Sequence, residues 1–269
     1  MIKVYNNNKT FLFDYQTYLL RDEVKYNLML GISNKDNDSF TFISSVIDNR
    51  FLLGVLAGKN LILASNTMDD EVYAEMIEYM DHIDYPGIIG TIEHCEKYNE
   101  LYTMKYGVSL VVKMNQRIYR CDKVKNYSEA VGIVRLATEK DIDMLKHWAL
   151  DFYVDIDPNT TLLQAKESVI EKIKRKVLFV LVVNDRVVSM IVRAREINKT
   201  ETVSFVYTPH EFRRKGFASR IVEEVTRFIH NDRRIATLYT DLDNPISNSI
   251  YMKIGYLPHC DSVMLNKNL

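Results

Sequence analysis

The chain has 269 residues, of which 47% are apolar and 26% charged, with only 9 Gly and 5 Pro. This composition is typical of a folded protein with real hydrophobic cores, and it excludes a long disordered tail. The 35 basic and 36 acidic residues give a net charge of −1, so bulk charge recruits neither nucleic acid nor an anionic membrane. Any binding of an anion must therefore come from a local basic cluster.

The number of cysteines and the lengths of the apolar runs indicate in which cellular compartment the protein is expected. Cys95, Cys121 and Cys260 are too few for a disulfide framework or a Cys-rich metal site. The N-terminal residues lack an apolar stretch of signal-peptide length. The longest apolar runs, 51–58 and 177–183, are far shorter than the roughly 20 residues that span a bilayer. We therefore expect a cytoplasmic protein.

The first half of the chain alternates between helix and strand patterns. In chain order, apolar spacing predicts a helix over 11–30, strands over 40–47, 51–57 and 61–64, a helix over 69–80, a strand over 86–90, a helix over 91–105 and a strand over 107–113. Short turn sequences separate the first three strands, which favours a meander.

The second half repeats a similar order. The pattern predicts a strand over 134–137, helices over 141–151 and 163–174, a hairpin of 177–183 with 187–193, a strand over 203–208, a helix over 216–230, a strand over 235–241, a helix over 245–254 and a last strand within 256–265. The polar stretch 122–130 is the expected boundary. We therefore predict two units in tandem, residues 1–130 and 131–269, although no strong residue-level repeat is evident.

A basic loop joins the strand that ends at Thr208 to the helix that begins near Gly216. A helix start offers free backbone N–H groups and a positive dipole end, which together bind phosphate. Gly216 lets the ligand approach the backbone closely, and Arg213, Arg214 and Lys215 add charge-assisted donors. The segment therefore predicts a pyrophosphate site. A solvated basic turn is the alternative that these four residues alone would favour.

The helix expected over 245–254 carries two stripes. Asn244 can cap its start, and Gly255 can end it. Isoleucines four residues apart predict the buried stripe, which consists of Ile246, Ile250 and Ile254. Hydrogen-bonding side chains follow a second row at i, i+3, i+4 and i+7, namely Asn244, Ser247, Asn248 and Tyr251. This polar row indicates a docking ligand, and an ordinary wet helix face is the alternative.

Both segments resemble motifs of the GNAT N-acetyltransferases. Arg213–Ala218 is similar to the acyl-CoA signature Arg/Gln-x-x-Gly-x-Gly/Ala, and Val206–Pro209 is similar to the strand end that precedes it. Ala218 stands where the family more often has Gly. Asn244–Tyr256 is similar to the C-terminal motif Asn-x-x-Ser/Ala-x-x-x-Tyr-x-x-x-Gly-Phe/Tyr. The two motifs occur in the family's order, and the resemblance covers about half of the chain.

The resemblance implies an α/β (α+β) GNAT fold, with a mixed, mostly antiparallel sheet flanked by helices. It also implies acetyl-CoA as co-substrate and no metal. The implied catalytic residue is Tyr251, which the family places near the thioester sulfur. The implied cofactor-binding residues are Val206, Tyr207, Thr208, Arg213, Arg214, Lys215, Gly216, Phe217, Ala218, Ser219, Asn244, Ser247 and Asn248.

These residues predict direct acetyl transfer from acetyl-CoA to a primary amine. Backbone N–H groups near Val206–Thr208 would stabilise the oxyanion, and the Tyr251 phenol, with a reference pKa of about 10, would protonate the thiolate. Glu201 and His210 are both candidates for the general base, and neither is chosen. Glu201 can equally be a solvated strand end or pair across strands with Arg193. An acyl-CoA-binding regulator or scaffold with little activity is the alternative function.

Residues 1–130 contain neither motif. Their element order is similar to that of a GNAT unit without its phosphate loop, as in tandem family members with one degenerate copy. This predicts a structural or substrate-shaping domain. The expected partner is a small-molecule amine or a peptide amine, whereas nucleic acid and membrane are not expected. Assembly as a homodimer is left open.

Overall fold

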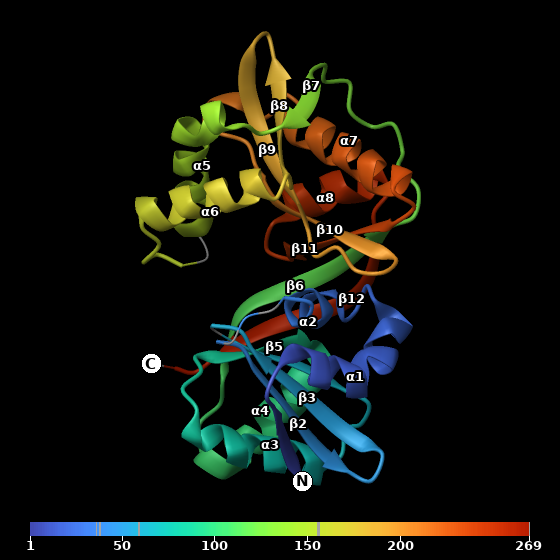
Figure 1. The fold of residues 1–269 in the computed structure, drawn as a ribbon, viewed down its shortest axis with the longest axis vertical. Coiled ribbons are helices and arrows are strands. Elements are labelled where there is room, and N and C mark those ends of the chain that lie inside the picture. The colour runs from blue at the N-terminus through green and yellow to red at the C-terminus, as the bar shows by residue number, and fades with distance from the viewer. Residues whose placement is uncertain (36, 38, 59, 155–156, 269) are drawn as a thin grey trace. The chain divides into compact units, whose positions relative to one another are not determined.

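The structure is a computed structural model that describes residues 1–35, 37, 39–58, 60–154 and 157–268 (Figure 1). The chain divides into two compact units. Unit 1 contains residues 1–119, 239–245 and 258–269, and unit 2 contains residues 120–238 and 246–257. Among the described residues, no helix is long and apolar enough to cross a membrane.

Unit 1 is built mainly from the first half of the chain. Its elements are β1 (Ile2–Tyr5), α1 (Asn8–Leu19), η1 (Leu20–Asp22), α2 (Asn27–Ser33), β2 (Thr41–Ile47), β3 (Arg50–Leu56), β4 (Leu61–Ser65), α3 (Asp70–Tyr79), η2 (Met80–His82), β5 (Gly87–Thr91), α4 (Ile92–Tyr106) and β6 (Val111–Cys121). The antiparallel pairings of β2 with β3 and of β3 with β4 confirm the expected meander.

Two expectations for the first half are corrected. The single helix over 11–30 is wrong, because α1 ends at Leu19 and a short 3-10 turn leads to α2. The Asp22 carboxylate stabilises that break by accepting a hydrogen bond from the backbone N–H of Lys25 at 3.0 Å. The last strand is Val111–Cys121 instead of 107–113. It starts late because Gly107 adopts φ 70° and ends α4 in the left-handed region, and it continues beyond the expected end at Lys113.

The sheet of unit 1 has the order β1-β2-β3-β4-β5-β12-β6. Its strand β12 (Leu257–Asn266) comes from the end of the chain and pairs antiparallel with β5, so that Ser262 lies opposite Thr91. Val263 and Leu265 of β12 are buried in the same core as side chains of α3 and α4. The strand expected at the end of the second half therefore completes the sheet of unit 1.

Unit 2 follows the order expected for the second half. Its elements are β7 (Ile133–Leu136), η3 (Glu139–Asp141), α5 (Ile142–Val154), α6 (Leu162–Lys174), β8 (Leu178–Val183), β9 (Arg186–Ala194), β10 (Thr200–Tyr207), η4 (His210–Phe212), α7 (Phe217–Asn231), the first part of β11 (Ile235–Asp241) and most of α8 (Pro245–Ile254). From β1 and from β7, the chain runs through the same succession of strands and α-helices, which supports a duplicated architecture.

The sheet of unit 2 has the order β11-β10-β9-β8-β7, and only β10 and β11 run parallel. Figure 1 shows α5 and α6 on one side of β8 and β9, and α7 on the other side. Leu145 and Trp148 of α5 and Val169 of α6 pack against β8, β9 and β10. The predicted fold class, a mostly antiparallel mixed sheet flanked by helices, is confirmed.

Candidate functional site

Strand β10 is deformed at its C-terminal end. Its pairing with β9 shifts register between Ser204 and Tyr207, and Phe205 inside the shift has φ 56°. A bulky side chain at positive φ is strained, and such strain is retained where surrounding structure enforces it. The parallel pairing with β11 covers only Thr200–Thr202 of β10, and the described residues Val203 and Leu238 do not continue it. The backbone of β10 beyond Thr202 is thus available on the β11 side.

The basic loop after β10 is exposed and held by its own backbone. The Nε of Arg213 donates a hydrogen bond to the carbonyl of Thr208 at 2.9 Å, and the Nζ of Lys215 donates one to the carbonyl of Glu211 at 3.1 Å. Arg213, Arg214 and Lys215 form no ion pair with any carboxylate in the described part of the chain. Their charges therefore remain available to an external anion.

Helix α7 begins without a side-chain cap. Gly216 occupies the N-cap position with φ 76°, a conformation that favours glycine. A Cβ atom added to Gly216 would lie 3.3 Å from the Cβ of Ala130. Because no side chain in the described part of the chain accepts from the first N–H groups, this helix start keeps its donors and its positive dipole end for an anion. Within the first turn, Phe217 and Ala218 are half-buried and Ser219 is buried.

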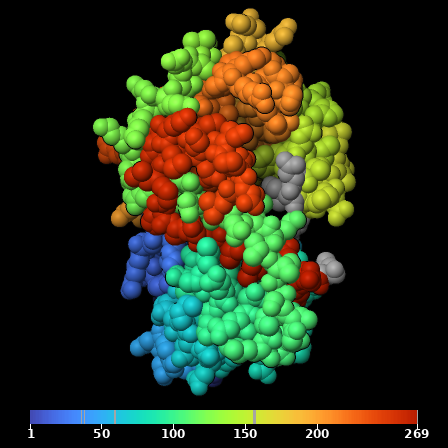
Figure 2. Space-filling view, turned by 180° about the vertical axis from the view of Figure 1, so that it is seen from behind, coloured from blue at the N-terminus to red at the C-terminus, as the bar shows by residue number. Residues whose placement is uncertain are grey.

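Residues 122–132 lie along α7 and fix its position. The backbone N–H groups of Tyr127 and Ser128 donate to one carboxylate oxygen of Glu223 at 3.1 and 2.9 Å, and the Ser128 hydroxyl donates to the carbonyl of Gly216 at 3.2 Å. Figure 2 shows this segment in green beside the orange to red surface of α7. The stretch expected as a linker therefore supports the start of α7.

Tyr251 on α8 has a half-buried side chain and an unpaired hydroxyl. Its ring lies 6.0 Å from the ring of Tyr256, whose hydroxyl hydrogen-bonds to that of Thr226 on α7 at 2.7 Å. Burial raises the pKa of Tyr251 to about 12. Within the described chain, no residue hydrogen-bonds to the Tyr251 hydroxyl. This group is thus a protonated phenol that can donate to a ligand.

The two stripes of α8 differ from expectation. Ile254 is fully buried, but Ile246 is 73% exposed, so the predicted isoleucine stripe is wrong in the first turn of the helix. On the polar row, Asn248 is buried and Ser247 half-buried, whereas Asn244 is exposed and belongs to unit 1. The physical reason is that Asn248 lies on the opposite side of α8 from Ile246, so that burying Asn248 leaves Ile246 in solvent.

The two candidates for the general base differ, because Glu201 is buried and paired whereas His210 is exposed. The carboxylate of Glu201 is buried and accepts two hydrogen bonds from the guanidinium of Arg193, at 2.7 and 2.6 Å. The cross-strand pair is therefore confirmed, and the solvated strand end is wrong. The pair also raises the pKa of Arg193. His210 lies exposed on η4, as expected for the surface.

Sequence reasoning missed a carboxylate on α5. Asp151 accepts a hydrogen bond from the hydroxyl of Tyr207, at the end of β10, at 2.7 Å. The ring of Tyr207 also lies 6.0 Å from that of Trp148. The helical spacing of Trp148 and Asp151 was a signal that both share one face of α5, but it did not indicate which strand they meet.

The corresponding region of unit 1 has the opposite charge. The helix α3, which follows β4 as α7 follows β10, begins at three acidic residues, Asp69, Asp70 and Glu71. Asp69 caps this helix by accepting from the N–H of Glu71 at 3.1 Å. Carboxylates at a capped helix start repel and exclude a phosphate group.

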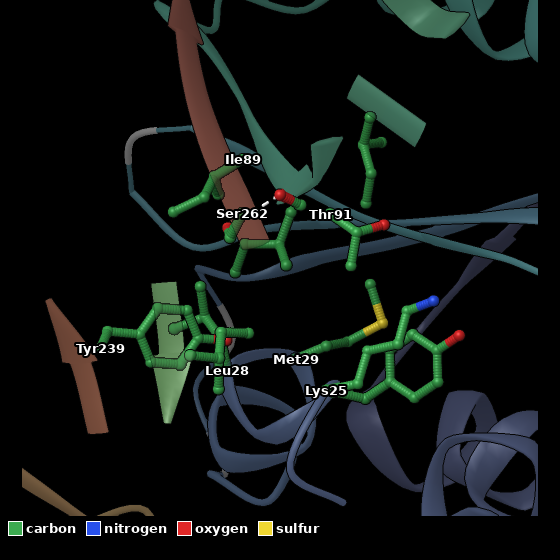
Figure 3. Close-up of a pocket in the computed structure, with 12 residues that line it drawn as sticks. Lys25, Leu28, Met29, Ile89, Thr91, Tyr239 and Ser262 are labelled. Atoms are coloured by element: carbon green, nitrogen blue, oxygen red, sulfur yellow. Dashed lines mark hydrogen bonds between the residues drawn. The ribbon is translucent and has the colours of Figure 1, made fainter. Parts of the chain in front are cut away.

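A small pocket in unit 1 lies at the seam of β4 and β5. It is lined by Ile62 and Leu63 of β4, by Ile89 to Thr91 of β5, and by Lys25, Tyr26, Leu28 and Met29. Figure 3 shows Leu28 and Met29 across the pocket from Ile89, Thr91 and Ser262. These apolar side chains occupy the seam, and Ser262 closes it by donating a hydrogen bond to the carbonyl of Gly90 at 2.8 Å.

Comparisons with known proteins agree with the fold. Residues 182–263 match the family model described as FR47-like protein. No curated protein sequence matches the chain. Among solved structures, an acetyltransferase of the GNAT family from Colwellia psychrerythraea is similar with a TM-score of 0.63 and 12% identity, and the match covers 100% of both chains.

Two further solved structures are similar over nearly the whole chain. A Drosophila protein has a TM-score of 0.63 and 14% identity over 99% of this chain and 98% of that one. A GCN5-related N-acetyltransferase from Kribbella flavida has a TM-score of 0.62 and 13% identity over 92% of this chain and 95% of that one. The segment 182–263, which contains both motifs, is therefore similar to FR47-like proteins, and the chain as a whole has the fold of these GNAT acetyltransferase structures.

Proposed function

We propose that the chain is an acetyl-CoA-dependent N-acetyltransferase whose active site lies in unit 2. One observation carries the proposal: the bulged end of β10 leads directly into an exposed basic loop and an uncapped helix start. This succession offers strand backbone that does not pair with β11, for an amide-containing arm, and N–H donors with positive charge for a pyrophosphate. CoA has both parts in one molecule.

The cofactor would be held mainly by backbone groups. Amides of Gly216–Ser219 at the start of α7, together with Arg213–Lys215, would bind the pyrophosphate. The pantetheine arm would pair with Val206–Thr208, and the polar side chains of Ser247 and Asn248 would contact it from α8. Unit 1 would bind no CoA, because its corresponding helix start is acidic.

The chemistry would be direct attack of an amine on the thioester. Backbone N–H groups near Val206 would stabilise the oxyanion, and Tyr251 would protonate the departing thiolate. A pKa of about 12 keeps that phenol protonated at neutral pH. The described residues contain no cluster of three or more His, Cys, Asp or Glu side chains suited to a metal ion, and the proposed reaction uses none.

An acyl-CoA-binding scaffold with little activity is the second candidate. It would need the loop but not a proton donor, so the unpaired hydroxyl of Tyr251 favours the enzyme. A cytoplasmic site of action is proposed as well, since Cys95, Cys121 and Cys260 are all free thiols.

Two measurements test the proposal. Calorimetry with acetyl-CoA should give one site per chain, and free-thiol release should then be followed with a polyamine, an aminoglycoside, free amino acids and a short peptide. Binding with amine-dependent thiol release supports the enzyme. Binding without release by any amine would support the scaffold, and no binding would contradict both candidates.

A further inference from the structure

Asp151 presents a carboxylate to the end of β10. Its Oδ2 accepts the hydrogen bond from Tyr207 Oη at 2.7 Å, yet the Asp151 side chain remains exposed. Tyr207 directly follows Val206, whose backbone N–H is one of the proposed oxyanion donors. The hydrogen bond therefore holds an accessible negative charge at the strand end where the acetyl group would lie.

The second oxygen of this carboxylate is available. Asp151 has no other hydrogen bond or ion pair with residues that the structure describes. The remaining charges near Tyr207 come from the loop and η4. The guanidinium carbon of Arg213 lies 6.0 Å from the Tyr207 ring, and its charge lowers the pKa of Tyr207, whereas the charge of Glu211 raises it. No lysine or arginine thus neutralises Asp151 directly within the described chain.

Tyr207, the partner of Asp151, remains a hydrogen-bond donor at neutral pH. Burial, followed by the hydrogen bond to Asp151, raises the pKa of Tyr207 to about 12. The phenol therefore keeps its proton across the neutral range, and the carboxylate keeps one bond to it while its other oxygen faces solvent. Glu201, in contrast, has both oxygens bonded to Arg193.

We propose that Asp151 binds the ammonium form of the acceptor amine and takes the proton that the amine must lose before attack. This inference rests on the proposed N-acetyltransferase function. A primary amine is largely protonated at neutral pH, so it arrives as a cation that an exposed carboxylate attracts. Tyr207 acts as the positioning residue, because its hydroxyl fixes the carboxylate.

One ammonium proton passes to the Asp151 carboxylate and then to water, which leaves a neutral amine. Its lone pair forms the N–C bond at the thioester carbonyl, and the C–S bond breaks. The sulfur takes the proton of Tyr251, and the second proton from nitrogen leaves to solvent, from which the phenolate is reprotonated. One net proton is released for each amide formed.

The test compares Asp151→Asn with the wild-type full-length chain. Two small amines with different ammonium pKa values, glycinamide and ethanolamine, serve as acceptors at saturating acetyl-CoA. At neutral pH we expect kcat/KM for the amine to fall about 100-fold, while calorimetry shows unchanged acetyl-CoA affinity. With rising pH the variant should recover, and the midpoint should follow the pKa of whichever amine is used, because free amine then no longer needs the carboxylate.

Three further variants complete the test. Asp143→Asn removes another exposed carboxylate from the same helix, one that pairs with Lys146 at 2.7 Å, and should leave turnover unchanged. Asp151→Glu should restore part of the activity, and Tyr207→Phe should cause a smaller loss than Asp151→Asn. A wild-type pH profile and kcat/KM in Asp151→Asn would overturn the inference while leaving the proposed function intact. A wild-type chain that binds no acetyl-CoA would overturn both.

Discussion

Tyr251 combines a half-buried ring with a hydroxyl that no described residue engages. Its substitution by Phe removes only that oxygen, so we expect acetyl-CoA affinity and stability to be nearly unchanged. Turnover should fall about 100-fold, because the thiolate would leave without a positioned acid. Calorimetry and thiol-release kinetics measure the two quantities separately.

Tyr256→Phe is the matched control for Tyr251→Phe. It removes a neighbouring phenol whose hydroxyl bonds to Thr226 in the interior. We expect a loss of about 1 kcal/mol in the free energy of unfolding but wild-type turnover per folded molecule. Equal turnover of Tyr251→Phe and the wild type would remove Tyr251 from catalysis.

His94 in unit 1 predicts a loss of stability at acidic pH. Its ring is 5% exposed and its Nδ1 hydrogen-bonds to the hydroxyl of Tyr73 at 2.8 Å. Burial lowers the pKa of His94 from 6.5 to about 4. As the pH falls through this window, the unfolded chain takes up a proton before the folded chain does, so stability present above pH 6.5 is lost, by about 2 kcal/mol at pH 5.

Urea denaturation of the full-length chain at pH 7 and pH 5 checks this loss. His94→Gln has no titrating ring, so its free energy of unfolding should fall less than that of the wild type between pH 7 and pH 5. The two falls should differ by about 2 kcal/mol. The free energy of unfolding is compared between the two pH values within each protein, so the pH-independent cost of the substitution cancels. The same pH dependence in both proteins would show that other groups cause it.

The residues of the candidate site differ in how far sequence could identify them. Arg213 and Gly216 were assigned to a loop and a helix start because those features depend on neighbours only a few positions away. Asp151 could not be found this way, since its partner Tyr207 is 56 positions distant. A contact of this kind depends on how α5 packs on β10, which local spacing does not encode.

At the scale of elements, strands and helices with strong periodicity were placed correctly, and breaks were not. The helix expected over 11–30 has apolar residues throughout, so its pattern does not reveal that Leu19 is followed by a 3-10 turn. The bulge in β10 could not be predicted from the sequence pattern, because positive φ at Phe205 has no composition signal. Tertiary packing decides such features.

Arg214, in the loop before α7, is expected to lower the stability of the fold while it strengthens acetyl-CoA binding. Arg214 has φ 62°, a conformation that costs a non-glycine residue about 1–2 kcal/mol. We expect Arg214→Gly to raise the free energy of unfolding by up to about 1 kcal/mol, after the entropic cost of glycine. The same change should weaken acetyl-CoA binding about tenfold, because one charge-assisted phosphate contact is lost.

Arg233→Gly is the control for Arg214→Gly. Arg233 follows α7, is exposed and has φ 61°. Its substitution should stabilise the protein to a similar extent without changing acetyl-CoA affinity. Chemical denaturation and calorimetry of both variants give the comparison, and equal loss of affinity in the two would mean that bulk charge, not the loop, binds the cofactor.

At the scale of the whole molecule, the duplicated order of elements was visible in the sequence. That the last strand of the chain belongs to the sheet of unit 1 was not visible. The pattern over 256–265 predicts a strand without naming its neighbours. In the structure β12 pairs with β5, more than 160 residues earlier in the chain. Unit 1 is therefore complete only when the whole chain is present, and a single cut near residue 130 does not separate two complete sheets.

A chain that ends at Tyr256 tests this dependence. It keeps Tyr256 in unit 2 but removes β12, and with it the buried side chains of Val263 and Leu265. Each is worth about 1.5–3 kcal/mol, and a strand's hydrogen bonds are lost as well, which together approach the 5–15 kcal/mol that a domain typically has. Amide hydrogen exchange should therefore show lost protection in β5 and retained protection in β8 and β9. A chain ending at Lys267 keeps β12 and should exchange like the wild type, whereas protected β5 amides without β12 would mean that unit 1 folds without its last strand.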